Sequence, residues 1–245
     1  MKKRMFIGTI ALMAGSLFAA DSSPKDDIAA AASKLADNGS YSWKSTMDLG
    51  PNSQFTPGPT EGKIDKDGYT WLSVTMNDNT SEGAKKGDKV AVKGEDGWQS
   101  ASEVSGDGGG GGGGGNPATF MARRMANLKP PAAEVQDLIS KVKDITKDGD
   151  TYSGELTEEG AKSLLTMGFG RRGGAGGNRP APTDAKGSVK FWIKDGALTK
   201  YQSKVSGKRE RNGEEVEIER TTTVEIKDVG ATKVSLPDEA KKKLS

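Results

Sequence analysis

The stretch from Gly187 to Lys227 constrains the fold more than any other part of the chain. It contains three runs rich in β-branched and aromatic residues, separated by Lys194-Asp195-Gly196 and by a charged loop that ends in Asn212-Gly213. Turns of this composition connect the strands of antiparallel hairpins. We therefore expect three consecutive antiparallel strands, joined through a three-residue loop at residues 194–196 and a turn at residues 212–213.

Alternation divides these runs into two faces, because successive side chains of a strand point to opposite sides of the sheet. In the last run, one face is mostly apolar and includes Val216, Ile218, Arg220, Thr222, Val224 and Ile226. The three-residue loop extends this face with Val189, Phe191, Ile193, Tyr201 and Val205. A two-residue turn would instead set Phe191 against Lys200, so we favour the longer loop. At the second turn, a two-residue connection would pair Arg211 with Glu214 and Lys208 with Glu217.

The first residues have the pattern of an export signal. Lys2, Lys3 and Arg4 precede an apolar run from Met5 to Phe18, which predicts a signal peptide over residues 1–20. A membrane anchor is the alternative, but the run is shorter than the roughly 20 residues that a spanning helix needs. Since the chain contains no cysteine, no lipid-modified cysteine can follow the signal. We expect a periplasmic or secreted protein, with peripheral or transient membrane contact at most.

Composition narrows the possible functions. Without the signal peptide and its 3 basic residues, 33 of the 36 basic residues stand against 34 acidic ones, and this near-neutral charge argues against nucleic acid as a partner. The chain has no histidine and no cysteine, which excludes histidine- and cysteine-based catalytic triads and typical zinc sites. We expect no enzyme, no catalytic residues, no metal and no cofactor.

The rest of the chain predicts one α+β domain over residues 21–245, with a largely antiparallel sheet and helices on one face. Further strands are expected at 41–49, 62–65, 69–76, 89–93, 98–101, 145–147, 151–156 and 232–235, and helices at 28–35, 117–128, 135–142, 157–167 and just after 237. Residues 77–87 are expected to be a polar connection. Two glycine-rich inserts, at 106–116 and 168–186, are expected to be flexible.

Three local patterns invite sharper functions that the residues do not support. The eight consecutive glycines of the first insert lack the lysine and hydroxyl residue of a phosphate-binding loop. The arginine-glycine tract at 171–174 could bind RNA, but an exported protein rarely meets RNA. The aspartates at 65–67 and 148–150 lack the further ligands of a calcium loop and are expected to form hairpin turns.

Aromatic and methionine residues are spread over nearly every expected element. They form either an ordinary core or the lining of a groove between sheet and helices, where adaptable apolar side chains could hold an acyl chain. The candidate lining residues are Trp43, Met47, Trp71, Phe120, Met121, Met125, Phe191, Tyr201, Val216, Ile218 and Arg220. Arg220 is the one charged member of this set.

The order of these segments resembles that of the LolA-like superfamily of exported bacterial proteins, which includes the LolA lipoprotein carrier and LppX/LprG-type lipid binders. The resemblance lies in the strand Tyr-Ser-Trp-Lys-Ser-Thr-Met, in the later Gly-Ser-Val-Lys-Phe-Trp-Ile-Lys-Asp-Gly, and in the terminal Leu-Pro-Asp-Glu-Ala. It implies a curved antiparallel half-barrel whose concave apolar face is covered by helices. It also implies binding of a lipid or of the acyl chain of a lipoprotein.

The sequence thus predicts a non-catalytic carrier or chaperone for a lipid or lipoprotein acyl chain. An envelope interaction or sensor module with the same fold and a closed core is the alternative, with an envelope protein as its partner. A carboxylate-based enzyme is a third possibility and requires acidic residues that converge in a cleft.

Overall fold

The computed structural model describes residues 22–51, 53, 55–76, 79–106, 116–167, 181–211 and 213–245. The predicted signal peptide lies outside these residues, as does most of both predicted inserts. The six described helices are α1 (Pro24–Asn38), α2 (Ala101–Gly106), α3 (Pro117–Ala126), α4 (Pro131–Ser140), α5 (Glu158–Met167) and α6 (Asp238–Lys243).

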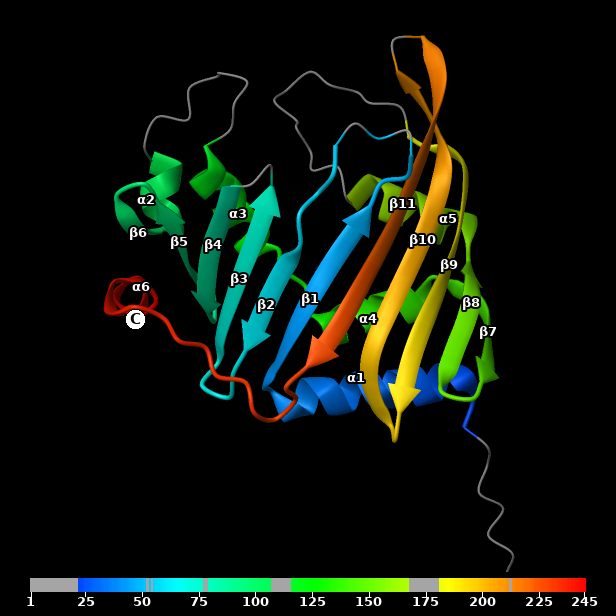
Figure 1. Cartoon of the computed structure of the whole chain (residues 1–245), viewed down its shortest axis with the longest axis horizontal. Coiled ribbons are helices and arrows are strands. Elements are labelled where there is room, and N and C mark those ends of the chain that lie inside the picture. Colours follow the sequence, from blue (N-terminus) through cyan, green and yellow to red (C-terminus); the bar gives the residue numbers. More distant parts are fainter. Residues whose placement is uncertain are drawn as a thin grey trace, which may run out of the picture.

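The strands form a single open antiparallel sheet, in the order β6-β5-β4-β3-β2-β1-β11-β10-β9-β8-β7 (Figure 1). They are β1 (Tyr41–Asp48), β2 (Thr60–Ile64), β3 (Tyr69–Met76), β4 (Asn79–Lys86), β5 (Lys89–Gly94), β6 (Gly97–Ser100), β7 (Val142–Asp148), β8 (Thr151–Leu156), β9 (Thr183–Lys194), β10 (Ala197–Arg211) and β11 (Glu214–Lys227). The pairing of β1 with β11 joins the early strands to the late ones. The predicted α+β class and antiparallel sheet are confirmed.

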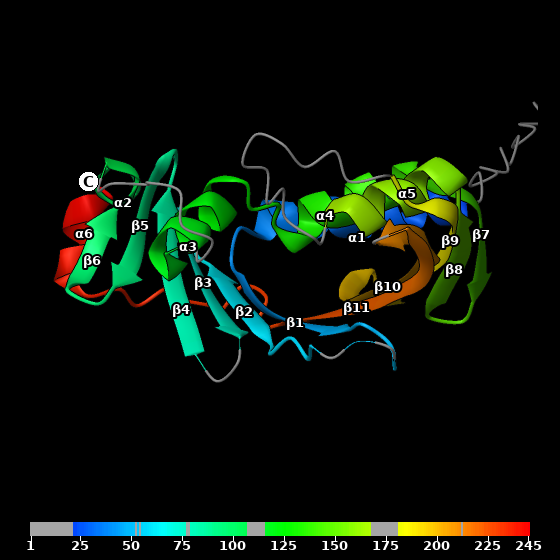
Figure 2. The same ribbon diagram turned by 90° about the horizontal axis from the view of Figure 1, so that it is seen from above.

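The sheet is bent like a trough, and α1, α4 and α5 lie across its concave side (Figure 2). The register and the burial agree with this arrangement, since the paired residues Trp43 and Ile226, and likewise Tyr201 and Val224, are buried on the helix side. Burial of this apolar face supplies most of the stability available to a chain without disulfides. The predicted curved sheet with helices over its concave face is confirmed.

One helix lies on the other face. Trp71 and Trp98 alternate with the concave residues of their strands and pack with Leu236, Ala240 and Leu244 in a separate small cluster. This cluster places α6 against the convex side of β5 and β6, which contact it. The expectation that all helices share one face is therefore wrong for α6. This helix is short, and the few apolar residues that attach it to the sheet, Leu236, Ala240 and Leu244, did not show from sequence which face they contact.

The β9–β10 hairpin has the shorter of the two turns considered from the sequence, but the facing residues expected from the longer one. Its turn has two residues, Asp195 and Gly196, with φ of 52° and 70°, so the predicted three-residue loop is wrong. A β-bulge at Thr199 then adds one residue to β10 and sets Tyr201 opposite Phe191. The predicted apolar face is nevertheless confirmed, because the bulge shifts the register as a longer loop would have done.

Four other local predictions change and one is confirmed. Residues 79–86 form β4, so the predicted polar connection is wrong; this strand was hidden by its small and polar residues. Residues 232–235 form no strand, and β9 begins at Thr183, inside the predicted second insert. The first insert begins after α2, which includes Gly106. At the second turn, Arg211 pairs with Glu214 and Lys208 with Glu217, as expected.

Helix α1 begins and ends where local chemistry requires. The hydroxyl of Ser23 accepts the backbone N–H of Asp26, whose carboxylate accepts the backbone N–H of Ser23 in return. This capping box satisfies two donors that the helix cannot satisfy itself. At the other end, Gly39 adopts a left-handed conformation with φ of 62°, which glycine tolerates best. The fixed helix lies over β9 and β10.

Candidate functional site

A row of half-exposed residues interrupts the otherwise buried concave face. Met47, Thr222 and Ser203 lie opposite one another on β1, β11 and β10. They share the face of the buried residues Trp43, Val224, Tyr201 and Val205, yet each remains partly accessible. Ser45 and Ile218 lie on the same face and are also half-buried. We call Ser45, Met47, Ser203, Ile218 and Thr222 the concave strip.

The concave strip combines apolar and hydrogen-bonding surface. Met47 and Ile218 supply the apolar part, and Ile218 packs against the main core. The hydroxyls of Ser45, Ser203 and Thr222 have no hydrogen-bond partner among the residues that the structure describes. Because hydroxyls both donate and accept hydrogen bonds, the strip offers three polar groups beside a flexible thioether side chain. This mixture suits an amphiphile better than a purely apolar ligand.

Arg220 borders the concave strip and is a buried charged residue on this face. It is only 6% exposed, and its Nη2 donates to the backbone oxygen of Leu164 on α5. Its Nε has no hydrogen-bond partner, and within the described residues no carboxylate forms an ion pair with it. Burial lowers the pKa of Arg220, while the charge of Glu134 raises it. An arginine remains charged in this setting.

A carboxyl–phenol pair lies across from the sheet. Glu134 on α4 accepts a hydrogen bond of 2.7 Å from the Tyr201 hydroxyl on β10. Burial raises the pKa of Glu134, although the Tyr201 hydrogen bond and the charge of Arg220 both lower it. Burial and the neighbouring Glu134 raise the pKa of Tyr201 well above its usual value. The pair ties α4 to the sheet and keeps a carboxyl close to Arg220.

The eleven residues expected to line a groove fall into four groups. Five are core residues with little or no exposure: Trp43, Met121, Met125, Phe191 and Tyr201. Three are half-buried on the concave face: Met47, Val216 and Ile218. Arg220 is buried beside them. The structure does not bring the remaining two to this site, since Phe120 on α3 is 41% exposed and Trp71 packs on the convex face near α6.

Sequence reasoning left four residues of this region out of the candidate set. Ser45, Ser203 and Thr222 share the parity of the apolar residues, so alternation already placed them on the concave face. Glu134 precedes Leu138 by four residues in α4, and this spacing puts both on neighbouring positions of one helix face. What the sequence could not reveal was that these positions stay accessible, because accessibility depends on where the helices cross the sheet.

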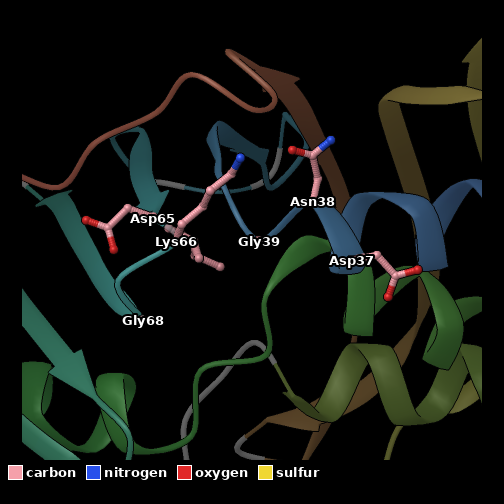
Figure 3. Close-up of a pocket in the computed structure, with 7 residues that line it drawn as sticks. Asp37, Asn38, Gly39, Asp65, Lys66 and Gly68 are labelled. Carbon is pink, nitrogen blue, oxygen red and sulfur yellow. The ribbon is translucent and has the colours of Figure 1, made fainter.

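Two pockets open elsewhere on the described surface. One, of about 640 Å³, lies between the end of α1 and the β2–β3 turn, and Figure 3 shows Asn38, Asp65 and Lys66 around it. Asp65 accepts backbone N–H groups of Asp67, Tyr69 and Val234, so this carboxylate holds a turn and the C-terminal segment. The second pocket, of about 470 Å³, lies beside Asp27, Lys147 and Tyr152. Neither is lined by a residue of the concave strip.

The contacts of Asp27 indicate that the polar residues at the second pocket have a structural role. Its carboxylate accepts hydrogen bonds from Ser22, from Lys147 at 3.0 Å and from Tyr152 at 2.8 Å. These bonds lower the pKa of Asp27 to about 2. The arrangement joins α1 to the edge strand β7 and to its neighbour β8. In the described part of the chain, no cluster of three or more potential metal-ligating side chains is found.

The length of the helices and the similarity of the chain to known proteins bear on its possible role. None of the described helices has the length and apolar character needed to cross a membrane. No protein-family model matches the chain, and no curated protein matches it either. Among solved structures, it is similar to the lipoprotein LppX of Mycobacterium tuberculosis, with 12% identity, 87% of this chain and 98% of that chain covered, and a TM-score of 0.47. It is also similar to LprF from Mycobacterium bovis, with 13% identity, 87% and 95% coverage, and a TM-score of 0.40.

Proposed function

We propose that this protein is a non-catalytic binder of an amphiphile, whose acyl chain lies along the concave strip beneath the helices. The observation that carries the proposal is the accessible row of Met47, Thr222 and Ser203 within a face that is otherwise buried. Partial exposure of Met47, and of Ile218 in the same strip, leaves apolar surface that a ligand would bury favourably. Methionine adapts well to flexible apolar chains.

We also propose a cellular role for this protein, that of an exported carrier or chaperone. The predicted signal peptide supports export to the periplasm or beyond, and the resemblance of the segment order to the LolA-like superfamily supports a carrier or chaperone for a lipid or a lipoprotein acyl chain. A carrier needs reversible binding, which an accessible strip between separate helices favours over an enclosed cavity. Several glutamates on the convex face of the sheet form ion pairs with lysines, such as Glu219 with Lys204 at 2.7 Å, which supports a structural rather than an acid–base role for them.

The alternative is an interaction or sensor module with a closed core. Full burial of Met121, Met125 and Phe191 favours it, because these side chains leave no room at the places where a groove was first expected. The two proposals differ in one respect: a closed-core module has no use for the concave strip, whereas a lipid binder requires it.

Native mass spectrometry of the protein with added palmitate, hexadecanol or phospholipid tests the proposal. We expect one bound chain on the wild-type protein. Thr222→Trp fills the strip and should abolish binding, while Thr221→Trp, on the opposite face of the same strand, should preserve it. Circular dichroism confirms that both variants fold. Absence of any bound lipid on the wild type, or equal binding by the two variants, contradicts the proposal.

A further inference from the structure

We propose that Arg220 is an anion-binding group and that the bound amphiphile carries an oxyanion head, a carboxylate or a phosphate, which the guanidinium holds. This inference rests on the proposed function and adds the chemical class of the ligand. It starts from Arg220 itself, which is 6% exposed and lies on the concave face of β11, two residues from Thr222 of the concave strip.

The charge of Arg220 is not neutralised within the described chain. One guanidinium nitrogen donates to the Leu164 oxygen, Nε has no partner, and no described carboxylate forms an ion pair with it. A buried ion without a counter-ion is strongly unfavourable unless a partner compensates it. Replacing a buried charge by an apolar residue is an easier solution for a protein that needs only packing. An unpaired donor at this position therefore points to an external acceptor.

Glu134 does not meet this need. Its carboxyl accepts the Tyr201 hydroxyl at 2.7 Å and interacts with Arg220 only through space. Burial raises its pKa, although the Tyr201 hydrogen bond and the charge of Arg220 both lower it. A second guanidinium, that of Arg124 on α3, donates to Thr60 on β2 at 3.2 Å and also interacts electrostatically with Glu134. Two guanidinium groups thus interact through space with the one carboxyl of Glu134, which cannot compensate both charges.

The surroundings of Arg220 match an oxyanion head followed by a chain. Thr222 and Ser203 lie opposite each other, one row away, with free hydroxyls among the described residues. Hydroxyl and guanidinium donors together suit a carboxylate or phosphate, whose oxygens accept several hydrogen bonds. Met47 and Ile218 continue the strip with apolar surface. Head and chain could therefore be held at neighbouring positions of one face.

Three ligands with the same C16 chain separate the head from the chain: palmitate, hexadecyl phosphate and neutral hexadecanol. Dissociation constants are measured by displacement of a bound fluorescent fatty acid, below the micelle concentration of each anion and below the solubility limit of hexadecanol. We expect at least one anion to bind about tenfold to a hundredfold more tightly than hexadecanol, the range that one charge-assisted hydrogen bond supplies. The tighter of the two anions identifies the head as carboxylate or phosphate.

Variants assign the preference to Arg220. Arg220→Met should reduce the ratio between the anionic and neutral constants to about one, with hexadecanol binding kept within about threefold, and Arg220→Lys should retain part of the ratio. Lys204→Gln, which removes a charge from the opposite face of β10, should leave it unchanged. If Arg220→Met does not fold, Thr222→Val and Ser203→Ala replace it, and we expect each to lower the ratio.

The outcomes separate this inference from the proposed function. Equal binding of the anions and hexadecanol by the wild-type protein overturns the inference and leaves acyl-chain binding intact. A preference that survives in Arg220→Met, or in both hydroxyl variants where that protein does not fold, also overturns it. Failure of all three ligands to bind overturns the proposed function itself.

Discussion

Replacing Gly62 by alanine tests how tightly the side chain of Trp43 packs over β2 on the concave face of the sheet. Gly62 on β2 lies opposite Trp43 on β1, and the indole ring covers the glycine so closely that an added Cβ would lie 2.0 Å from Trp43 Cζ2. Real side chains do not approach to this distance, so the ring or the strand must move. Since Trp43 is 6% exposed, the ring has little freedom to yield.

Two opposing effects determine how much Gly62→Ala changes the free energy of unfolding. Alanine reduces the conformational freedom of the unfolded chain, which stabilises by about 0.4–1 kcal/mol when the native backbone accepts it. Overpacking of a filled core costs about 1–3 kcal/mol. The clash dominates, so we expect a net loss of about 2 kcal/mol in the free energy of unfolding. For a chain of this size, that corresponds to a decrease of roughly 4–8 °C in Tm.

Urea denaturation followed by circular dichroism measures the effect. Gly94→Ala is the matched control, because Gly94 also lies in a strand and the closest contact of its added Cβ would be the flexible end of Gln99, at 2.9 Å, with the Gly97 oxygen at an ordinary 3.6 Å. We expect this control to change stability by less than about 0.5 kcal/mol. In a Trp43→Leu background, Gly62→Ala should cost much less, because the ring is gone. Equal effects of the two glycine substitutions, or no coupling to Trp43, would refute the packing described here.

Three further sets of variants, two of substitutions and one of deletions, test local features. Ser23→Ala removes the capping box of α1 and should cost about 1 kcal/mol in urea denaturation, whereas Ser23→Asp should cost much less. Burial raises the pKa of Glu134 above 4.5, so the folded state binds its proton more tightly, and stability should fall as pH rises from about 4.5 through the raised pKa; Glu134→Gln should remove this part of the pH dependence of unfolding. Deleting the bulge residue Thr199 keeps Tyr201 opposite Phe191, whereas deleting Gln202 turns Val205 outward; we expect only the second deletion to abolish cooperative thermal unfolding.

The sequence predicted the β9–β11 face well because alternation there is strong. Val189, Phe191, Tyr201 and Val205 were assigned to one face from alternation and from the turn length that keeps them together, and all four are buried. The turn between β9 and β10 was wrong because one β-bulge at Thr199 and one longer loop give the same facing residues. Parity determines which side chains share a face, but it does not determine where the extra residue lies.

Strand β4 could not be predicted from its own residues. Its sequence, Asn-Thr-Ser-Glu-Gly-Ala-Lys-Lys, has no apolar alternation. It is a strand through its pairing with β3 and β5, and Gly83 lets α3 pack closely on it: a Cβ there would lie 2.7 Å from Met125 Cγ and 3.1 Å from Met121 Cγ. The space that a side chain at position 83 would occupy is filled by methionines more than 35 positions away in the chain. The residues of β4 themselves do not indicate this packing.

The candidate site was predicted in part. Arg220 was recognised as the polar exception on the concave face, and Met47 and Ile218 were placed near it. Trp71 was assigned to the groove because it is aromatic, although its parity relative to the buried Leu72 puts it on the convex face. Ser203 and Thr222 were passed over because they are polar. Their accessibility follows from the crossing of the helices, which the sequence does not specify.

Paramagnetic NMR with a nitroxide-labelled stearate distinguishes a ligand on the concave strip from one elsewhere. The protein carries labelled methionine methyl groups and labelled tryptophan indoles. We expect the Met47 methyl signal to broaden on binding, with little change at the indoles of Trp71 and Trp192, whose residues lie on the opposite face. Broadening at Trp71 or Trp192 without any at Met47, or no broadening at all, would contradict binding of an acyl chain along the concave strip.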